Sequence, residues 1–333
     1  TSQKVPQWYP ISISGYHMRE AGSNAIQELA FTFANAIEYI ETCQHRGLDI
    51  DSFAPRLSFF FCCTMEFFEE IAKFRAARRI YSKLMKEKFG AKDQKSCHLR
   101  FHVQTSGESL TAQQVDNNIV RVSLQALAAV LGGCQSLHTN SRDEALALPT
   151  EESVKIALRT QQIMAHETGV TKTVDPIGGS YYVEELTNTI IDKVDEYLHR
   201  IESLGGALAA VEKGYFQDEI RKNSYNLKKA IDENTRIIVG VNKFHDINNS
   251  EPQLNLINPD AERKQISRLK EFKQSRDHVK VDAALSRLLK ASETDDENLM
   301  PHIIDSVKNH VTMGEISSVF KEVFGTYQPK ISF

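Results

Sequence analysis

The chain has 333 residues, of which 41% are hydrophobic, and its formal net charge is −4. This length accommodates one large domain or two ordinary ones with a substantial core. The slightly acidic balance gives no bulk electrostatic reason to expect nucleic-acid binding, and no apolar run reaches the roughly 18–20 residues of a membrane span.

Four strand-like runs occur early in the chain, at 9–14, 57–63, 98–104 and 134–138. The first three are followed by amphipathic helical patterns over 26–40, 66–88 and 118–131. The first strand ends in Gly15-Tyr16-His17, and the sequence there predicts direct entry into the long helix. Strand and helix alternating at a period of roughly 40 residues are typical of βα units and a parallel sheet.

The third strand alternates apolar Leu99, Phe101 and Val103 with polar residues, so one face of the predicted sheet is polar. A sheet covered by helices on both faces should be apolar on both. We therefore predict an α/β barrel whose axis is polar and partly open. The alternative is a polar face solvated at a sheet edge. The polar positions are Ser12, Ser14, Ser58, Arg100, His102 and Ser136.

The remainder of the chain is mainly helical. Helical patterns are predicted over 150–167, 184–203, 208–212 and 216–234, and an isolated strand over 237–240. Asn258-Pro259 is a helix start signal, and one long helix is predicted from there to 291, with a last helix over 303–320.

The five cysteines are few, odd in number and mostly embedded in apolar runs. This usage is typical of buried free thiols in a reducing compartment, not of a disulfide framework. The first residues lack the apolar core of a signal peptide, so we expect a cytoplasmic location. No pair has zinc-site spacing, and no metal site is expected. The cysteines are Cys43, Cys62, Cys63, Cys97 and Cys134.

Five sequence blocks carry a resemblance to a known family. They are Ser-Gly-Tyr-His-Met-Arg-Glu-Ala-Gly (14–22), Phe-Ala-Pro-Arg-Leu-Ser-Phe-Phe (53–60), Gln-Thr-Ser-Gly (104–107), Gln-Ser-Leu-His-Thr-Asn-Ser-Arg-Asp-Glu-Ala-Leu (135–146) and Asp-Pro-Ile-Gly-Gly-Ser-Tyr-Tyr (175–182). In this order they resemble the large subunit of adenosylcobalamin-dependent acyl-CoA mutases, the methylmalonyl-CoA mutase family. The resemblance covers nearly the whole chain, and Ile177 stands where the family usually has an aromatic residue.

The resemblance implies the C-terminal half of a (β/α)8 TIM barrel followed by a mainly helical region. The expected parts are 1–150, the second half of the barrel with four βα units; 151–244, a helical region packing on it; 245–260, a linker; and 261–333, a C-terminal helical segment. An open half-barrel has unpaired edges, so its first half should come from another chain or from a longer form of this one. A complete fold of a different kind is the alternative.

The family resemblance also implies an activity. In these enzymes coenzyme A threads the barrel axis and adenosylcobalamin covers its C-terminal rim, which implies the radical interconversion of methylmalonyl-CoA and succinyl-CoA. No Asp-x-His-x-x-Gly signature occurs in the chain, so a separate cobalamin-binding subunit is an expected partner. The alternatives are an isobutyryl-CoA or 2-hydroxyisobutyryl-CoA mutase, or a non-catalytic half-barrel that serves assembly. A metal-dependent hydrolase barrel is weak, because no carboxylate cluster accompanies His98 and His102.

The resemblance also assigns site residues. His17 and Gln104, each at the end of a strand, match catalytic residues near the substrate thioester carbonyl. Without the resemblance, an ordinary polar residue closing a strand is favoured for His17, and a loop amide fits Gln104 equally well. Residues matching positions that face the corrin and the adenosyl group are Tyr16, Glu20, Asn140 and Glu144, although acids in a first helical turn would explain the two glutamates equally. Residues matching the coenzyme A path are Arg56, Ser58, Lys95, Gln135 and Ser136.

Overall fold

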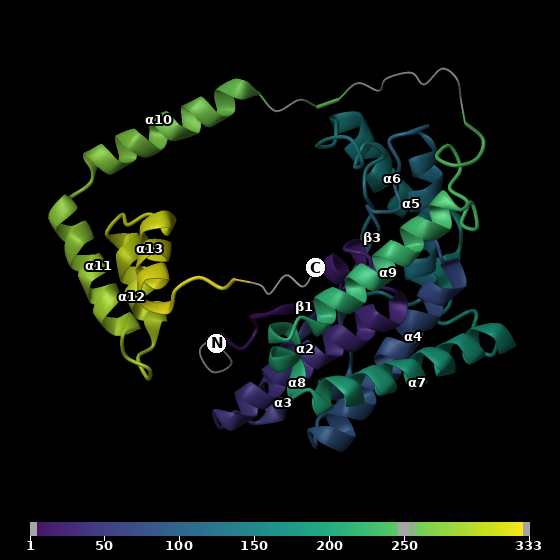
Figure 1. Ribbon diagram of the computed structural model, residues 1–333, viewed down its shortest axis with the longest axis horizontal. Helices are drawn as coiled ribbons and strands as arrows, with labels where there is room; N and C mark the ends of the chain where they lie inside the picture. Colours follow the sequence, from purple (N-terminus) through teal and green to yellow (C-terminus); the bar gives the residue numbers. More distant parts are fainter. Residues whose placement is uncertain (1–4, 246–253, 256–257, 329–333) are drawn as a thin grey trace. The chain divides into compact units, whose positions relative to one another are not determined.

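The computed structural model describes residues 5–245, 254–255 and 258–328. The described chain forms two compact units, one within residues 5–255 and one within residues 258–328 (Figure 1). Most of the predicted linker, 245–260, lies outside the described residues. Within the described residues, no helix is long and apolar enough to cross a lipid bilayer.

The first unit contains a four-stranded parallel sheet with strands in the order of the sequence. The strands are β1 (Ser12–Ser14), β2 (Ser58–Cys63), β3 (Phe101–Thr105) and β4 (Ser136–His138). Strands and helices alternate along the chain as predicted, but the first and third strands begin three residues later than expected. Each crossover carries helices, which is the arrangement that joins adjacent parallel strands.

One face of the sheet is apolar and lies against helices. Its side chains are at most 2% exposed: Ile13, Phe59, Phe61, Phe101 and Val103. The covering helices are α2 (Ala25–His45), α4 (Phe67–Lys83) and α5 (Asn117–Leu131). Burial of these aromatic and branched side chains provides the main hydrophobic stabilisation of the unit.

A second helical layer packs on the first. α7 (Tyr181–Ser203) contacts both α2 and α4, and α8 (Gly206–Glu212) contacts both α2 and α9 (Tyr215–Asp232) (Figure 1). α6 (Glu151–Glu167) instead contacts α5. The 3-10 helix η4 (Val170–Lys172) precedes α7.

The chain does not pass directly from β1 into the long helix, so that prediction was wrong. A short helix, α1 (Tyr16–Glu20), follows β1, and α2 begins only after a capping box formed by Asn24 and Gln27. The remaining short elements are α3 (Ile50–Phe53), η1 (Ala54–Arg56), the π-helical turn η2 (Leu84–Lys88) and η3 (Gln94–Cys97).

The predicted strand at 237–240 is also absent. Val239 forms only an isolated bridge with Lys243, because the segment makes a turn in which Asn242 accepts a hydrogen bond from the backbone of Ile238. A local side-chain bond of this kind competes with strand pairing.

The second unit consists of α10 (Pro259–Ser275), α11 (His278–Ser292), α12 (Leu299–Lys308) and α13 (Met313–Phe324). The single predicted helices over 259–291 and 303–320 are therefore wrong. The first is interrupted where Asp277 caps α11, and the second where His310 has φ of +65° and Thr312 caps α13. Side chains such as Val281 and Leu288 form a separate small core.

Candidate active site

The polar face of the sheet is arranged in rows, because neighbouring strands are in register. One row pairs Ser12 with Ser58, and a second contains Ser14, Phe60, His102 and Ser136. The third row contains Cys62, Gln104 and His138. The rows follow one another toward the carboxyl ends of the strands, where open α/β folds place their ligand sites.

The middle row contains one aromatic side chain among polar ones. His102 Nδ1 lies 2.7 Å from Ser136 Oγ, and the His102 ring lies 5.1 Å from that of Phe60. Burial, with a smaller effect of His138, lowers the pKa of His102. In the first row, Ser58 Oγ donates to the carbonyl oxygen of Ile11 at 2.9 Å. The face is therefore polar, and several of its polar side chains already have hydrogen-bond partners within the chain.

α1 carries three predicted site residues over the carboxyl edge of the sheet. The Tyr16 ring stacks on Phe60, and burial, reinforced by Glu20, raises the pKa of the Tyr16 phenol. His17 is exposed, with Nδ1 3.3 Å from Ser14 Oγ, and partial burial of its ring lowers its pKa. Near neutral pH, a neutral phenol and a neutral imidazole therefore lie side by side on this turn.

Glu20 is the best-anchored carboxylate of this edge. Its Oε1 accepts hydrogen bonds from Ser106 Oγ at 2.8 Å and Cys62 Sγ at 3.3 Å, and its Oε2 accepts from the Glu108 amide at 2.9 Å. A Cβ at Gly107 would lie only 3.2 Å from Glu20 Oε2, so glycine permits this close approach. Glu20 ends α1 and does not lie in a first helical turn.

Gln104 and Asn140 join the ends of β3 and β4. Gln104 Nε2 donates to Asn140 Oδ1 at 2.8 Å, and Asn140 Nδ2 donates to the Thr105 carbonyl oxygen at 2.8 Å. Glu144 lies in a turn beside Gly107, and burial raises its pKa, opposed by His138 and assisted by Glu20. Five predicted residues are thus brought together as the rim group: Tyr16, Glu20, Gln104, Asn140 and Glu144.

The predicted coenzyme A residues lie toward the opposite edge. Arg56, Lys95 and Gln135 lie in the segments that lead into β2, β3 and β4, in that order. Arg56 donates to the Pro6 carbonyl and to the Gln7 amide oxygen, at 3.0 and 2.6 Å, and Lys95 is exposed in η3. Gln135 accepts from the Phe101 amide at 2.7 Å. With Ser58 and Ser136 on the face between, these residues are separate from the rim group.

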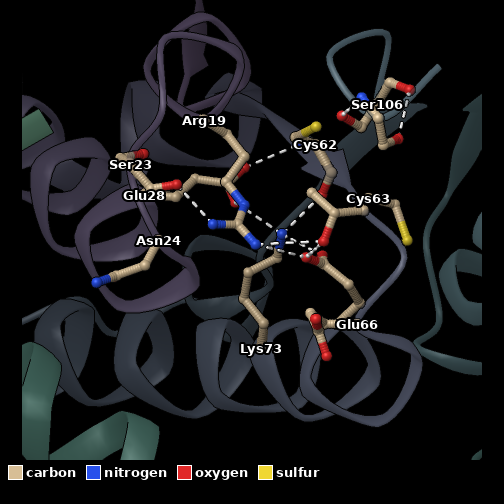
Figure 2. A network of polar contacts seen from close by, with 12 residues as sticks. Arg19, Ser23, Asn24, Glu28, Cys62, Cys63, Glu66, Lys73 and Ser106 are labelled. Atoms are coloured by element: carbon tan, nitrogen blue, oxygen red, sulfur yellow. Dashed lines mark hydrogen bonds and ion pairs between the residues drawn. The ribbon is translucent and has the colours of Figure 1, made fainter. Parts of the chain in front are cut away.

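Sequence reasoning missed several contributors. Ser106 and Gly107 were inside the quoted block 104–107 but received no role, and Cys62 was interpreted only as a buried thiol. A cluster of four charged side chains was also missed, formed by Arg19, Glu28, Glu70 and Lys73. Figure 2 labels Arg19, Glu28 and Lys73 of this cluster. The available signal was that Glu28 occurs within a mainly apolar stretch of α2, whereas Lys73 lies among other charged residues of α4. Among the described residues, no group of three or more His, Cys, Asp or Glu side chains could hold a metal ion.

The family follows from comparison with known proteins. A sequence model of the family described as methylmalonyl-CoA mutase matches residues 1–326. The chain belongs to this family. The resemblance drawn from the five sequence blocks is therefore confirmed, and the site geometry can be considered with the family's other members.

Among those members, the 2-hydroxyisobutanoyl-CoA mutase large subunit of Aquincola tertiaricarbonis is 47% identical over 332 residues, covering 98% of this chain and 58% of that protein. The mitochondrial methylmalonyl-CoA mutase of Mus musculus is 45% identical over 329 residues, covering 98% and 44%. The methylmalonyl-CoA mutase of Rhizobium meliloti (strain 1021) is also 45% identical, covering 98% and 46%. The chain thus spans about half the length of the curated relatives it matches.

Proposed function

We propose that residues 1–150 are the second half of a (β/α)8 barrel, with 151–244 packed on it, a linker at 245–260 and a C-terminal helical segment at 261–333. The sheet supports this, because its helices cover only one face and its other face is polar. Within the described residues, β1 and β4 each pair with one strand only. Such edges invite further strands, which a first barrel half would supply.

The proposed activity is that of an acyl-CoA mutase, an isomerase that interconverts methylmalonyl-CoA and succinyl-CoA. The observation that carries it is the rim group at the carboxyl edge, directly above a polar face along which a long substrate could lie. The second candidate is a 2-hydroxyisobutyryl-CoA or isobutyryl-CoA mutase, favoured by the relative at 47% identity that is named as a large subunit.

The rim group fits the adenosyl portion of adenosylcobalamin. Glu20 and Glu144 offer carboxylate acceptors for ribose hydroxyls, and Asn140 offers an amide beside them. The absent side chain of Gly107 leaves room between these groups, since a Cβ there would lie 3.4 Å from Asn140 Nδ2. When bound, this cofactor supplies the radical chemistry. The chain's residues would orient it, with the Tyr16 ring facing the corrin.

His17 and Gln104 are the proposed catalytic residues. A neutral His17 can donate a hydrogen bond to the thioester carbonyl of the substrate and so stabilise charge that develops on its oxygen. Gln104 is oriented by Asn140, which leaves one amide hydrogen of Gln104 for the substrate. Neither role requires a charged side chain beside the reacting carbonyl.

Toward the other edge, the chain would bind coenzyme A. Arg56 and Lys95 are cations suited to its phosphates, and Ser58, Gln135 and Ser136 are polar groups suited to the pantetheine. Arg56 would have to exchange its present contacts with Pro6 and Gln7 for the ligand. The proposed partners are therefore an acyl-CoA, the first barrel half where another chain supplies it, and a cobalamin-binding subunit.

A reconstitution experiment tests the proposal. The chain would be purified from its native source, and its bound partners identified by mass spectrometry. The resulting assembly, supplied with adenosylcobalamin, would be given methylmalonyl-CoA, isobutyryl-CoA or 2-hydroxyisobutyryl-CoA in parallel. We expect isomerisation of methylmalonyl-CoA and none by the chain alone. Turnover of another acyl-CoA alone would favour the second candidate, and no turnover of any would contradict the mutase function.

A further inference from the structure

β1 stops pairing with β2 before β2 ends. The last backbone bond between them joins the Gly15 amide to the Phe60 carbonyl oxygen at 2.8 Å, after which the chain turns into α1. In a parallel sheet, successive residues of a strand direct their backbone groups to opposite neighbours. The Ser106 amide donates to Cys63, so Cys63 bonds toward β3, and Cys62 must face the side that β1 has left.

Two charged side chains occupy that place. The Cys62 amide donates to Glu28 Oε1 at 2.7 Å, and Lys73 Nζ donates to the Cys62 carbonyl oxygen, also at 2.7 Å. Lys73 Nζ lies 2.7 Å from Glu28 Oε2, and both side chains are fully buried. Buried backbone groups require partners, and here a carboxylate and an ammonium group serve where a strand would have continued (Figure 2).

The charges at this point are balanced. Glu70 Oε2 lies 2.5 Å from Lys73 Nζ, and Arg19, from α1, lies 3.3 Å from Glu70 Oε1. Arg19, Glu28, Glu70 and Lys73, the buried quartet, thus contain two charges of each sign. Burial alone would lower the pKa of Lys73, but the two carboxylates raise it above its ordinary value. The quartet joins α1 to α2 and α4, the helices behind the rim.

We propose that Glu28 and Lys73 are positioning residues that replace the missing extension of β1. They let the chain leave the sheet at Gly15, and so place Tyr16, His17 and Glu20 over the rim. Cys62 connects the two levels, since its backbone is held by the pair and its Sγ donates to Glu20. That this positioning serves the mutase reaction rests on the proposed function. The positioning of α1 itself does not depend on that function.

Residue-resolved hydrogen exchange on the unmodified full chain tests the first step. If Glu28 replaces a strand, the Cys62 amide should exchange within about tenfold of the rate of Phe61, which pairs with β3. A Cys62 amide that exchanges roughly a hundredfold faster than Phe61 would overturn the proposal. This measurement requires neither a folded variant nor any ligand.

The variant Lys73→Met tests the consequence for α1. We expect exchange of residues 15–22 to accelerate by about tenfold or more, because the Cys62 carbonyl loses its donor and the two carboxylates keep only Arg19 as a cation. The control is Arg75→Gln on the same helix, which loses ion pairs to Asp175 and Glu184 but has no contact with β2 among the described interactions. The control should leave exchange of 15–22 unchanged. Equal exchange in a folded Lys73→Met would overturn the proposal, and a variant that fails to fold leaves the Cys62 measurement to decide.

In the assembled enzyme, Glu28→Gln provides a readout that mere stability would not move. Glutamine retains the acceptor for Cys62 but loses the charge that faces Lys73. We expect kcat to fall by roughly tenfold with KM for the acyl-CoA changed less than about twofold, because α1 faces the proposed cofactor side. An unchanged kcat would contradict the role. Absence of turnover in the unmodified assembly would contradict the proposed function, while the exchange data would still decide the positioning.

Discussion

The ring of Tyr16 lies parallel to the ring of Phe60, with 4.7 Å between centroids and 5° between planes. Phe60 belongs to the middle row of the polar face, and Tyr16 is the first residue of α1. The stack therefore places the start of α1 over that row. The relationship explains why an aromatic residue interrupts an otherwise polar face. It supports the turn from which His17 and Glu20 project.

Tyr16→Ala should destabilise the first unit by about 0.5–1.5 kcal/mol beyond the loss of buried area, since the stacked pair is removed. Tyr16→Phe keeps the ring and should cost little. Urea denaturation monitored by far-UV circular dichroism would measure the unfolding free energy of both variants. Equal stability of the two variants would show that the stack does not contribute.

His17 should titrate below the ordinary histidine value of about 6.5, because burial lowers its pKa. The sign follows from linkage: the unfolded chain binds the proton more readily, so His17 stabilises the fold above pH 6.5 and that contribution is lost as pH falls through the folded pKa. NMR titration of labelled imidazoles would measure the midpoint, with His17→Gln to assign the signal. A midpoint at or above 6.5 would contradict this interpretation of the burial.

His17→Ala should reduce turnover by the reconstituted enzyme by about 10²–10⁴-fold, the usual range for a positioned acid–base group. His17→Gln keeps a hydrogen-bond donor and should lose less. The matched control is His199→Ala, on the outer helix α7, which should leave kcat unchanged. Full turnover by His17→Ala would remove His17 from the catalytic machinery.

Asn140→Ala should destabilise the first unit by about 1–3 kcal/mol, because the buried Thr105 carbonyl and the half-buried Gln104 amide lose their partner. Asn140→Asp keeps the acceptor for Gln104 but loses the donor to the Thr105 carbonyl. Its stability should therefore lie between that of the unmodified chain and that of Asn140→Ala. Denaturant midpoints would rank the three proteins. The reverse order, with Asp the least stable, would indicate that the repulsion from nearby carboxylates outweighs the lost donor.

The sheet and the rim group were accessible from the sequence for different reasons. Alternation of Phe101 and Val103 with His102 and Gln104 fixes strand faces directly, because side-chain direction has a period of two. The residues of the rim group came from the family resemblance, since spacing alone could not bring Glu20 beside Asn140. Their distances depend on three crossovers that no local pattern encodes.

The short helix α1 and the buried quartet were not predicted. Both depend on the early end of β1, which leaves the backbone amide and carbonyl of Cys62 without a neighbouring strand on that side. This is a relation among three segments that are far apart in the sequence. The breaks in the second unit were missed for a more local reason. Asp277 and Thr312 are cap residues, but each lies inside a continuous helical pattern whose period outweighed the cap signal.

Gly15→Ala tests the tight turn from which the site extends. Gly15 has φ of −94° and ψ of −20°, which alanine adopts readily, so any cost must come from packing. A Cβ there would meet Thr32 Oγ1 and would lie 2.8 Å from Glu28 Cγ, the latter fixed in the buried quartet. We expect a loss of about 1–3 kcal/mol in unfolding free energy.

Thr32→Ala removes the hydroxyl and should restore part of that loss in the double variant. The control is Gly314→Ala, which has open space around it and should cost nothing. A fully stable Gly15→Ala would mean that α2 can move away from the turn, and the rim could then not be held as described.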